Sequence, residues 1–353
     1  LKNELNRFPN FSKGDGILIS LSGGVDSTSL LVLMCTTSQY KISVAHINHN
    51  LRKESNDEEK FVKNLCVKLN VKCFIESLNP AIIKKGSSKE EWARTARYRF
   101  LKEISAKTNS KWVMTAHHAN DQAETILMNL SRKSGVMGLR GISKENGNIL
   151  RPFIRIKKYE INNFSKRLKI PYCEDKTNSN ISIPRNFIRH EVLNPWEINS
   201  PYIIEGLRDS AEHFNDWKVA LDYLVIQTLI PKINQTHNTF SIPIEIIESL
   251  PKMAQIRFFQ IIMDGSDSFQ WSKHQIKRLE QFIKKVKTGN NYQSHIGWHL
   301  SHNRGDIIGK KMSSNNDLSE IGLILNTPTI FNNYKYELSL HDMQSNSVNK
   351  ESI

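Results

Sequence analysis

Long apolar runs, paired cysteines and a secretion signal are all lacking from this 353-residue sequence. No apolar run approaches the roughly 20 residues that cross a bilayer, so no membrane segment is expected. The first residues show neither a basic segment followed by an apolar one nor a cleavage site, which argues against secretion. The chain starts with Leu1 rather than Met, so whether residues precede it is left open. The sequence therefore predicts a cytoplasmic protein.

Cysteine is scarce, and its spacing excludes several kinds of site. The four cysteines are Cys35, Cys66, Cys73 and Cys173. No pair of them has the spacing of a zinc site, a disulfide framework or a redox motif. We expect reduced thiols that fill apolar sites.

Positive charge is in excess, with 49 Lys and Arg against 35 Asp and Glu and a net charge of +14. A surface this basic usually has a polyanion as its partner, so nucleic acid is considered first. Residues 151–189 hold ten Lys and Arg against three Asp and Glu, a net charge of +7 and half of the total excess. We expect RNA to contact this stretch, with a merely solvated basic face as the alternative.

Short apolar segments alternate with helical patterns along the first half of the chain. Strands are expected at 16–21, 42–47, 73–78 and 112–116. Helices are expected at 26–34, 57–69, 89–108 and 121–131. This alternation predicts an α/β fold with a doubly wound parallel sheet.

The pattern changes after about Pro195. Helical patterns at 210–230, 243–264 and 272–287 follow one another without strand signals between them, which predicts a helical second domain. The predicted domains are 1–195 for the nucleotide-binding part, 196–288 for the helical part, 289–342 for a small extension with short strands, and 343–353 for a disordered tail.

A glycine-rich motif stands directly between the first expected strand and the first expected helix. It reads Ser22-Gly23-Gly24-Val25-Asp26-Ser27. The glycines let the backbone turn tightly, and the N–H groups of the helix N-terminus can donate to phosphate oxygens together with the hydroxyls. No Gly-Lys-Ser/Thr follows, so this is not a Walker loop, and Asp26 beside a phosphate requires a divalent cation between them. The motif predicts a phosphate cradle, with a turn capped by Asp26 as the alternative.

Two carboxylates, Asp121 and Glu124, stand three residues apart at a helix start that follows the fourth expected strand. They should face the same way and be partly stabilised by the helix dipole. Such a pair can share a magnesium ion with ATP phosphates or position a reacting amine, whereas helix capping by Asp121 is the simpler alternative. The neighbouring histidines His117 and His118 are adjacent, which disfavours a zinc site.

The glycine motif resembles the pyrophosphate loop of the N-type ATP pyrophosphatases (PP-loop superfamily, adenine nucleotide α-hydrolase-like fold). Further motifs follow in order: His46 to Arg52, Glu90 to Tyr98, Thr115 to Thr125, Arg132 to Ile142, Arg151 to Phe153, Glu174 to Asn178 and Arg185 to Arg189. Together they resemble the tRNA(Ile)-lysidine synthetase family from Ile17 to Arg189. Departures are Asn120 in place of a common Asp, and Asn180 and Ile183 in place of the usual Asp and Tyr.

The resemblance implies a carbon–nitrogen ligase that joins L-lysine to the wobble cytidine of tRNA(Ile) with a CAU anticodon. It implies ATP and Mg²⁺, with an adenylated base as the intermediate. For the nucleotide it implies Ser22, Gly23, Gly24, Val25, Asp26, Ser27, His46 and Asn48, and for the metal Asp26, Asp121 and Glu124. Catalytic roles fall on Asp26, Asp121, Glu124, His117 and Arg185. Positioning of RNA or substrate falls on Arg94, Arg97, Arg151, Asp175, Asn178, Asn186 and Arg189.

Other functions fit the sequence less well. RNA thiolases of the same superfamily generally use a Cys-x-x-Cys pair, which this chain lacks. Relatives of GMP synthetase or asparagine synthetase would not explain the basic stretch 151–189 or the His46 to Arg52 segment. A non-catalytic tRNA-binding relative would be favoured by a damaged cradle or missing carboxylates, and both are intact. Homodimerisation is left open.

Overall fold

A computed structural model describes the chain except for residues 1, 38, 52–53, 84–87, 175, 237, 266–270, 286–288, 313–328, 332–333, 339–347 and 353. The chain forms two compact units. The first comprises Leu1–Pro231 and Lys252–Ser272, and the second comprises Lys232–Pro251 and Lys273–Ile353. None of the described helices is both long and apolar enough to cross a membrane.

A six-stranded sheet forms the centre of the first unit. Its strands are β1 (Gly16–Ser20), β2 (Lys41–Asn48), β3 (Lys72–Ser77), β4 (Trp112–Met114), β5 (Glu145–Asn146) and β6 (Ile149–Leu150). They lie in the order β3-β2-β1-β4-β6-β5, and all neighbours are parallel except β5 and β6. The predicted α/β fold with a parallel sheet is thereby confirmed.

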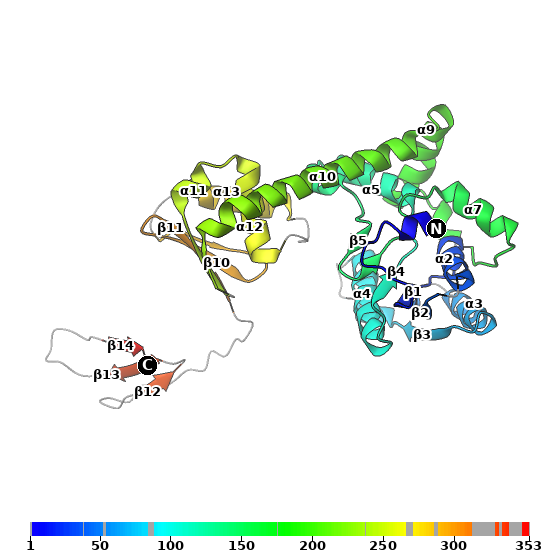
Figure 1. Cartoon of the computed structure of the whole chain (residues 1–353), viewed down its shortest axis with the longest axis horizontal. Helices are drawn as coiled ribbons and strands as arrows, with labels where there is room; N and C mark the ends of the chain where they lie inside the picture. The colour runs from blue at the N-terminus through cyan, green and yellow to red at the C-terminus, as the bar shows by residue number, and fades with distance from the viewer. Residues whose placement is uncertain are drawn as a thin grey trace. The chain divides into compact units, whose positions relative to one another are not determined.

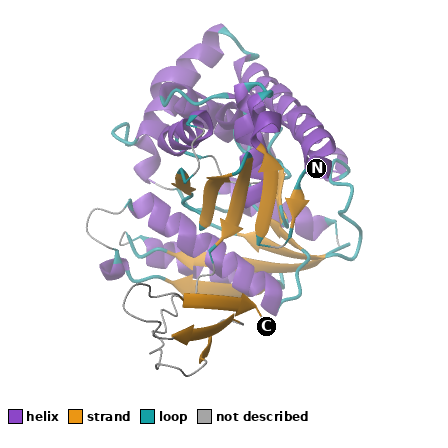
Figure 2. Ribbon diagram, turned by 90° about the vertical axis from the view of Figure 1, so that its left-hand side faces the viewer, coloured by secondary structure: helices purple, strands orange, loops and turns teal. Residues whose placement is uncertain are grey.

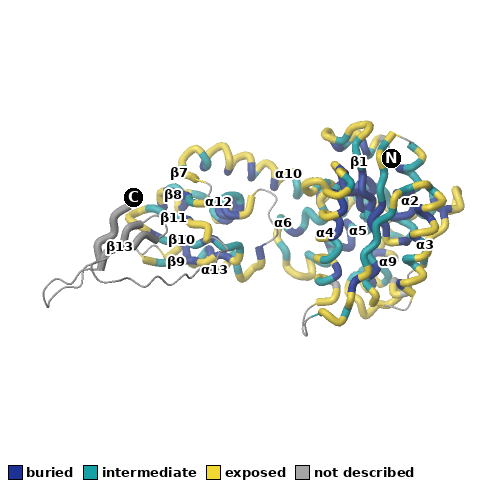
Figure 3. Tube along the Cα trace, turned by 90° about the horizontal axis from the view of Figure 1, so that it is seen from below, coloured by how far each residue is buried: buried dark blue, intermediate teal, exposed yellow. Residues whose placement is uncertain are grey.

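Helices cover both faces of this sheet, as Figures 1 and 2 show. The helices of this part of the chain are α1 (Lys2–Leu5), α2 (Val25–Thr36), α3 (Ser55–Lys68), η1 (Pro80–Ile82), α4 (Lys89–Lys107), α5 (Ala119–Ser131), α6 (Val136–Leu139) and α7 (Lys158–Arg167). Successive side chains of a strand point to opposite faces. Ile17 and Ile19 of β1 accordingly join the core on the side of α2 and α3, while Leu18 joins the core on the side of α4. The burial of β1 is visible in Figure 3.

The strand order reverses beside β1, because β2 follows on one side of it and β4 lies on the other. In open α/β sheets, ligands bind in the crevice at the carboxyl ends of the strands where the order reverses. Two connections, from β1 into α2 and from β4 into α5, meet at this edge. The topology therefore places the glycine motif and the carboxylate motif next to each other.

The rest of the first unit is helical. Its helices are η2 (Lys176–Ser179), α8 (Pro184–Phe187), the π-helical turn η3 (Ile188–Leu193), α9 (Asn194–Asn199), α10 (Ile203–Leu229), η4 (Ile230–Lys232, which runs into the second unit) and α12 (Lys252–Asp264). Helix α12 is fixed on α10 by buried charges. Arg257 donates to both carboxylate oxygens of Asp222 at 2.5 and 2.9 Å, and Lys218 lies 2.9 Å from the same carboxylate.

The second unit contains two antiparallel sheets. The first sheet has β7 (Asn234–Gln235), β8 (Thr239–Pro243), β9 (Asn291–Gln293), β10 (Trp298–Asn303) and β11 (Asp306–Lys311), in the order β7-β8-β11-β10-β9. The second sheet has β12 (Thr329–Phe331), β13 (Tyr334–Leu338) and β14 (Val348–Ser352). Helices α11 (Ile244–Glu248) and α13 (Lys273–Lys284) complete the unit.

One sequence-based expectation needs correction in this part of the chain. The expected helix 243–264 is divided into α11 and α12, because Pro251 cannot continue a helix. Strands β7 and β8 lie within the expected domain 196–288, and β14 lies within the expected tail 343–353, of which residues 343–347 and 353 lie outside the described residues. The predicted domains and their bounds after 195, 288 and 342 stay a prediction.

Candidate active site

The glycine motif forms a tight turn from β1 into α2. Gly23 has a φ of +95°, in the region that favours glycine. The hydroxyls of Ser22 and Ser27 lie 3.0 Å apart, and the Ser22 amide donates to the Ser27 hydroxyl at 3.1 Å. The amide of Cys173 donates to the Gly23 carbonyl at 2.9 Å. The turn is therefore held by its own serines and by a distant segment.

A cavity of about 500 Å³ opens beside this turn. The predicted site residues that line it are Ser22, Gly24, Asp26, Ser27, His46, Arg97, His117, Asp121 and Arg185. Ser20, Ala45 and Thr115 also line the cavity, which places it at the carboxyl ends of β1, β2 and β4. The structure thus brings the three motif regions around one space, as the order of the strands predicts.

Two residues beside Asp26 were not predicted. The Lys158 ammonium lies 2.6 and 2.7 Å from the two carboxylate oxygens of Asp26. His118 Nε2 lies 3.8 Å from Asp26 and 3.6 Å from Asp121. Each residue belongs to a pattern that the sequence shows, because Lys158 lies in the basic stretch and His118 adjoins His117. Neither pattern distinguishes a site residue from its neighbours in the sequence.

His118 links the cradle to the carboxylate motif through a fixed tautomer. It is the N-cap of α5, and its Nδ1 accepts a hydrogen bond from the Asp121 amide at 3.3 Å. The Asp121 carboxylate accepts from the His118 amide at 3.0 Å in return. With Nδ1 as an acceptor, a ring proton belongs on Nε2, the atom that lies between the carboxylates of Asp26 and Asp121.

Arginines hold both carboxylates of α5. Glu124 is fully buried and accepts from Arg185 Nε at 2.6 Å and from Arg189 at 2.6 and 3.1 Å. Arg185 also donates to Asp121 at 2.9 Å. Asp121 lines the cavity whereas Glu124 does not. Glu124 thus holds both arginines, and Asp121 is the member of the pair that lines the cavity. The metal-binding roles of Glu124 and Asp121 stay a prediction.

The titration of the cavity wall follows from burial and charge. Burial lowers the pKa of His117. The Asp121 charge acts in the opposite direction and raises this pKa, whereas nearby arginines lower it further, namely Arg151, Arg185 and Arg97, and the pKa lies at about 3. Burial alone would raise the pKa of Asp121, but His118, Arg185 and His117 lower it to about 2. At neutral pH, the cavity therefore contains a neutral imidazole at His117 and a charged carboxylate at Asp121.

Replacing His117 by Gln should make the free energy of unfolding less dependent on pH between 6.5 and 5. The folded-state pKa of about 3 lies below the ordinary value of about 6.5. As pH falls through this window the unfolded chain takes up the proton first, so His117 lowers stability by up to about 2 kcal/mol. Asp121 does not contribute here, because its folded-state pKa of about 2 is also below its ordinary value and its effect begins only below about pH 3.9.

Urea unfolding at pH 5, 6.5 and 7.5 measures this dependence. The same replacement at His213 offers a matched control, because it removes an imidazole that is exposed rather than buried. An equal pH dependence in the His117 variant and the unmodified protein would show that the imidazole is not kept neutral by the fold.

Several predicted site residues lie outside the cavity wall. Asn48 donates to Asn56 and Glu59, and Arg94 lies over the Tyr98 ring at 5.0 Å. Three others bind backbone or buried acid: Arg151 donates to Ser143 O, Asn186 to the carbonyls of Thr177 and Asn180, and Arg189 to Glu124. Gly23 and Val25 belong to the glycine turn but do not line the cavity. Asp175 and the side chain of Asn178 lie outside the described residues.

Asp26 provides a suitable place for a divalent cation. Both of its oxygens already accept from a cationic ammonium, and Mg²⁺ is usually held by one or two carboxylates together with substrate phosphates. Among the described residues no group of three or more His, Cys, Asp or Glu could hold a metal ion. The arrangement therefore fits an ion shared with phosphates, held by Asp26 with Asp121 nearby.

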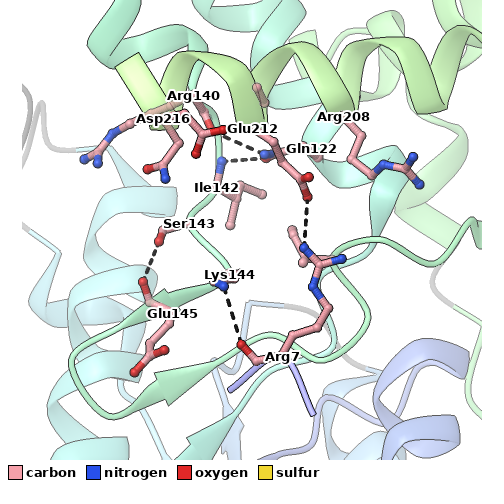
Figure 4. A pocket seen from close by; sticks show the side chains of 13 residues that line it. Arg7, Gln122, Arg140, Ile142, Ser143, Lys144, Glu145, Arg208, Glu212 and Asp216 are labelled. Carbon is pink, nitrogen blue, oxygen red and sulfur yellow. Dashed lines mark hydrogen bonds and ion pairs between the residues drawn. The ribbon is translucent and has the colours of Figure 1, made fainter. Parts of the chain in front are cut away.

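A second cavity, of about 370 Å³, is lined by Gln122 of α5, the segment from Arg140 to Glu145, and α10 (Figure 4). Gln122 fixes its wall by donating to Arg140 O at 3.2 Å and accepting from the Ile142 amide at 2.5 Å. Arg7 and Glu212 face each other across it at 3.7 Å. None of the predicted site residues lines this cavity.

Known proteins resemble this chain in sequence and fold. The PP-loop domain family matches residues 1–196. The tRNA(Ile)-lysidine synthase of Thermosipho africanus is 35% identical over 314 residues, covering 87% of this chain and 71% of the relative. The enzyme of Thermotoga maritima is 36% identical over 186 residues, covering 51% of this chain and 45% of the relative. The enzyme of Chlorobaculum tepidum is 32% identical, covering 62% and 68%.

The share of each relative that is covered and the solved structures of similar fold add to this comparison. The match to the Thermotoga maritima enzyme spans less than half of that relative's length. Among solved structures, the U34-tRNA thiolase NcsA from Methanococcus maripaludis has a TM-score of 0.50 at 15% identity, covering 60% of this chain and 77% of that chain. Likeness at this identity shows the fold alone. Since the PP-loop family matches residues 1–196 and the Thermosipho africanus enzyme is 35% identical along most of the chain, the chain belongs to the tRNA(Ile)-lysidine synthase family.

Proposed function

We propose that this protein joins L-lysine to the wobble cytidine of tRNA(Ile) with a CAU anticodon, consuming ATP. One observation carries the proposal: the glycine turn, Asp26 and Asp121 line a single cavity at the switch point of the sheet. A nucleotide bound there would have its phosphates at the N-terminus of α2 and a carboxylate beside them. Family membership supports lysidine synthesis over the other reactions of the superfamily.

In the first step the cytidine 2-oxo group attacks the α-phosphate of ATP, and pyrophosphate leaves. The amides at the start of α2 and the hydroxyls of Ser22 and Ser27 bind the leaving phosphates. Mg²⁺, when bound by Asp26 and the phosphates, supplies positive charge that neutralises them. His118 Nε2 lies 3.8 Å from Asp26 and 3.6 Å from Asp121, where a ring N–H attracts both carboxylates. The residues thus position the nucleotide for an in-line attack.

In the second step the lysine ε-amine attacks the activated carbon and AMP leaves. The amine must be deprotonated, and its substrate must be oriented. Asp121 is a charged carboxylate in the cavity and orients the incoming amine, while Arg185 fixes Asp121. His117, with a pKa of about 3, is too weak a base to remove the proton and therefore serves in positioning.

The test mixes purified protein, ATP, Mg²⁺ and labelled lysine with tRNA(Ile) bearing a CAU anticodon. Label should appear on this RNA and depend on ATP. A methionine tRNA with the same anticodon is the matched control, and it should remain unlabelled. Absence of label on tRNA(Ile) from folded protein would reject the proposed activity, and equal labelling of both RNAs would reject the selectivity.

Three further proposals concern tRNA contact, cellular location and oligomeric state. The basic stretch 151–189 contacts tRNA phosphates in this proposal, so binding should weaken as salt is raised. Cytoplasmic location stays a prediction that cell fractionation tests. Homodimerisation is open to measurement by the mass of the protein in solution.

A further inference from the structure

We infer that Lys158 is a phosphate-contacting residue, which pairs with Asp26 in this structure and moves to the outer phosphates of the nucleotide when it binds. The inference rests on the proposed use of ATP. It begins from the ion pair in which one ammonium lies 2.6 and 2.7 Å from both oxygens of the Asp26 carboxylate. Among the contacts of the described residues, no other cation lies so close to Asp26.

This ion pair must open when a nucleotide binds. Asp26 belongs to the cradle and lines the cavity, so a polyphosphate in the cradle brings several negative charges beside its carboxylate. A divalent cation between carboxylate and phosphates relieves that repulsion, but it needs at least one of the oxygens that Lys158 now occupies. Lys158 and the metal ion therefore compete for Asp26.

The displaced ammonium remains at the phosphates because the backbone of Lys158 is anchored. Its amide donates to the Asn120 side chain at 2.9 Å, and Lys158 is the first residue of α7, which packs against α2. The side chains of Lys158 and Asp26 are 33% and 27% exposed, so the ion pair lies at an open edge where an exchange costs little burial. A lysine that already reaches Asp26 needs only a side-chain rotation to reach the phosphates of a nucleotide bound beside Asp26.

Asn120 contacts the backbone of Lys158 and so belongs to the same group of residues. The sequence marks it as a departure from the family pattern, and the structure uses its side-chain oxygen to accept the Lys158 amide. An amide side chain does this without adding a third negative charge beside Asp26 and Asp121. Asn120 is thus a positioning residue for Lys158.

Nucleotide affinity, measured by calorimetry without tRNA, tests the inference. We expect Lys158→Met to weaken ATP binding at least about tenfold, because a charged hydrogen bond to the β or γ phosphate is lost. Affinity for AMP, which lacks those phosphates, should change less than about twofold. Lys158→Arg should retain most of the ATP affinity, and Lys102→Met, which changes an exposed lysine of α4, should bind ATP as the unmodified protein does.

The outcomes separate this inference from the proposed function. ATP binding by Lys158→Met as tight as, or tighter than, that of the unmodified protein would show that Lys158 only blocks the site, and would overturn the inference. Equal losses for ATP and AMP would overturn it too, because they would indicate a distorted cavity. Failure of the unmodified protein to bind ATP would instead reject the proposed function.

Discussion

Replacement of Asp26 by Asn is expected to lower the rate of lysine transfer to tRNA(Ile) about a thousandfold. Asn keeps the shape of the side chain but removes the negative charge that holds a cation against the departing phosphates, and losses of about 10²–10³ are typical when one charge-stabilising group is removed. Asp26 has the only carboxylate among the described cavity-lining residues that lies inside the cradle itself. Single-turnover labelling of the RNA with saturating ATP measures the effect.

A surface aspartate supplies the control for this prediction. Asp57 forms an exposed ion pair with Lys60, and its replacement by Asn should leave the rate unchanged. The Asp26 variant should also remain folded, because the side chains of the Asp26–Lys158 pair are each partly exposed. A rate above about a tenth of the original would show that the cation is held elsewhere.

The second large effect concerns stability rather than chemistry. Replacement of Glu124 by Gln is expected to lower the free energy of unfolding by about 3–5 kcal/mol, the range for breaking a buried ion pair from one side. Glu124 is 0% exposed, and it accepts three hydrogen bonds from Arg185 and Arg189. Without its charge, the two guanidinium groups keep Asp121 as their acidic partner among the described contacts.

Urea unfolding compares this variant with Glu103→Gln, which removes an exposed partner of Arg99 and should cost less than about 1 kcal/mol. If Glu124→Gln unfolds like the unmodified protein but needs much more Mg²⁺ for activity, the original prediction of a metal ligand would be right. A lower free energy of unfolding together with an unchanged Mg²⁺ requirement would establish that Glu124 holds the arginines.

The sequence is sufficient to predict the sheet and the cradle because their signals are local. Apolar runs such as Ile17 to Ile19 mark buried strands, and glycines directly after such a run mark a turn at the end of the strand. Strand order then follows from alternation of strands and helices, and it brings the motifs together. The cavity wall around Asp26, His117 and Asp121 could therefore be predicted without coordinates.

The sequence does not predict which basic side chain pairs with which carboxylate. Arg189 and Lys158 lie in one basic stretch, yet Arg189 binds the buried Glu124 and Lys158 binds Asp26. Which cation meets which carboxylate depends on how α5, α7 and η3 pack, and nothing in the spacing of Lys and Arg reports that packing. The same holds for His118, whose role follows from its place as the N-cap of α5.

Short strands between helices were also missed, for a different reason. In β8 only Phe240 and Ile242 alternate as buried residues, and two such positions are too few to establish a period. Its place in the sheet depends on distant contacts. Phe240 packs where Gly309 of β11 has no side chain, since a Cβ there would lie 2.1 Å from the ring.

The path of the chain between the two units limits where the protein can be cut. Helix α12 belongs to the first unit, although the residues before and after it belong to the second. A fragment that stops at Pro231 would lose Arg257, and Asp222 would keep Lys218 as its one cationic partner among the described residues. A shortened protein that keeps the nucleotide cavity would therefore have to retain Lys252–Ser272 and bridge residues 232–251 with a linker, so truncation from one end cannot yield an intact first unit.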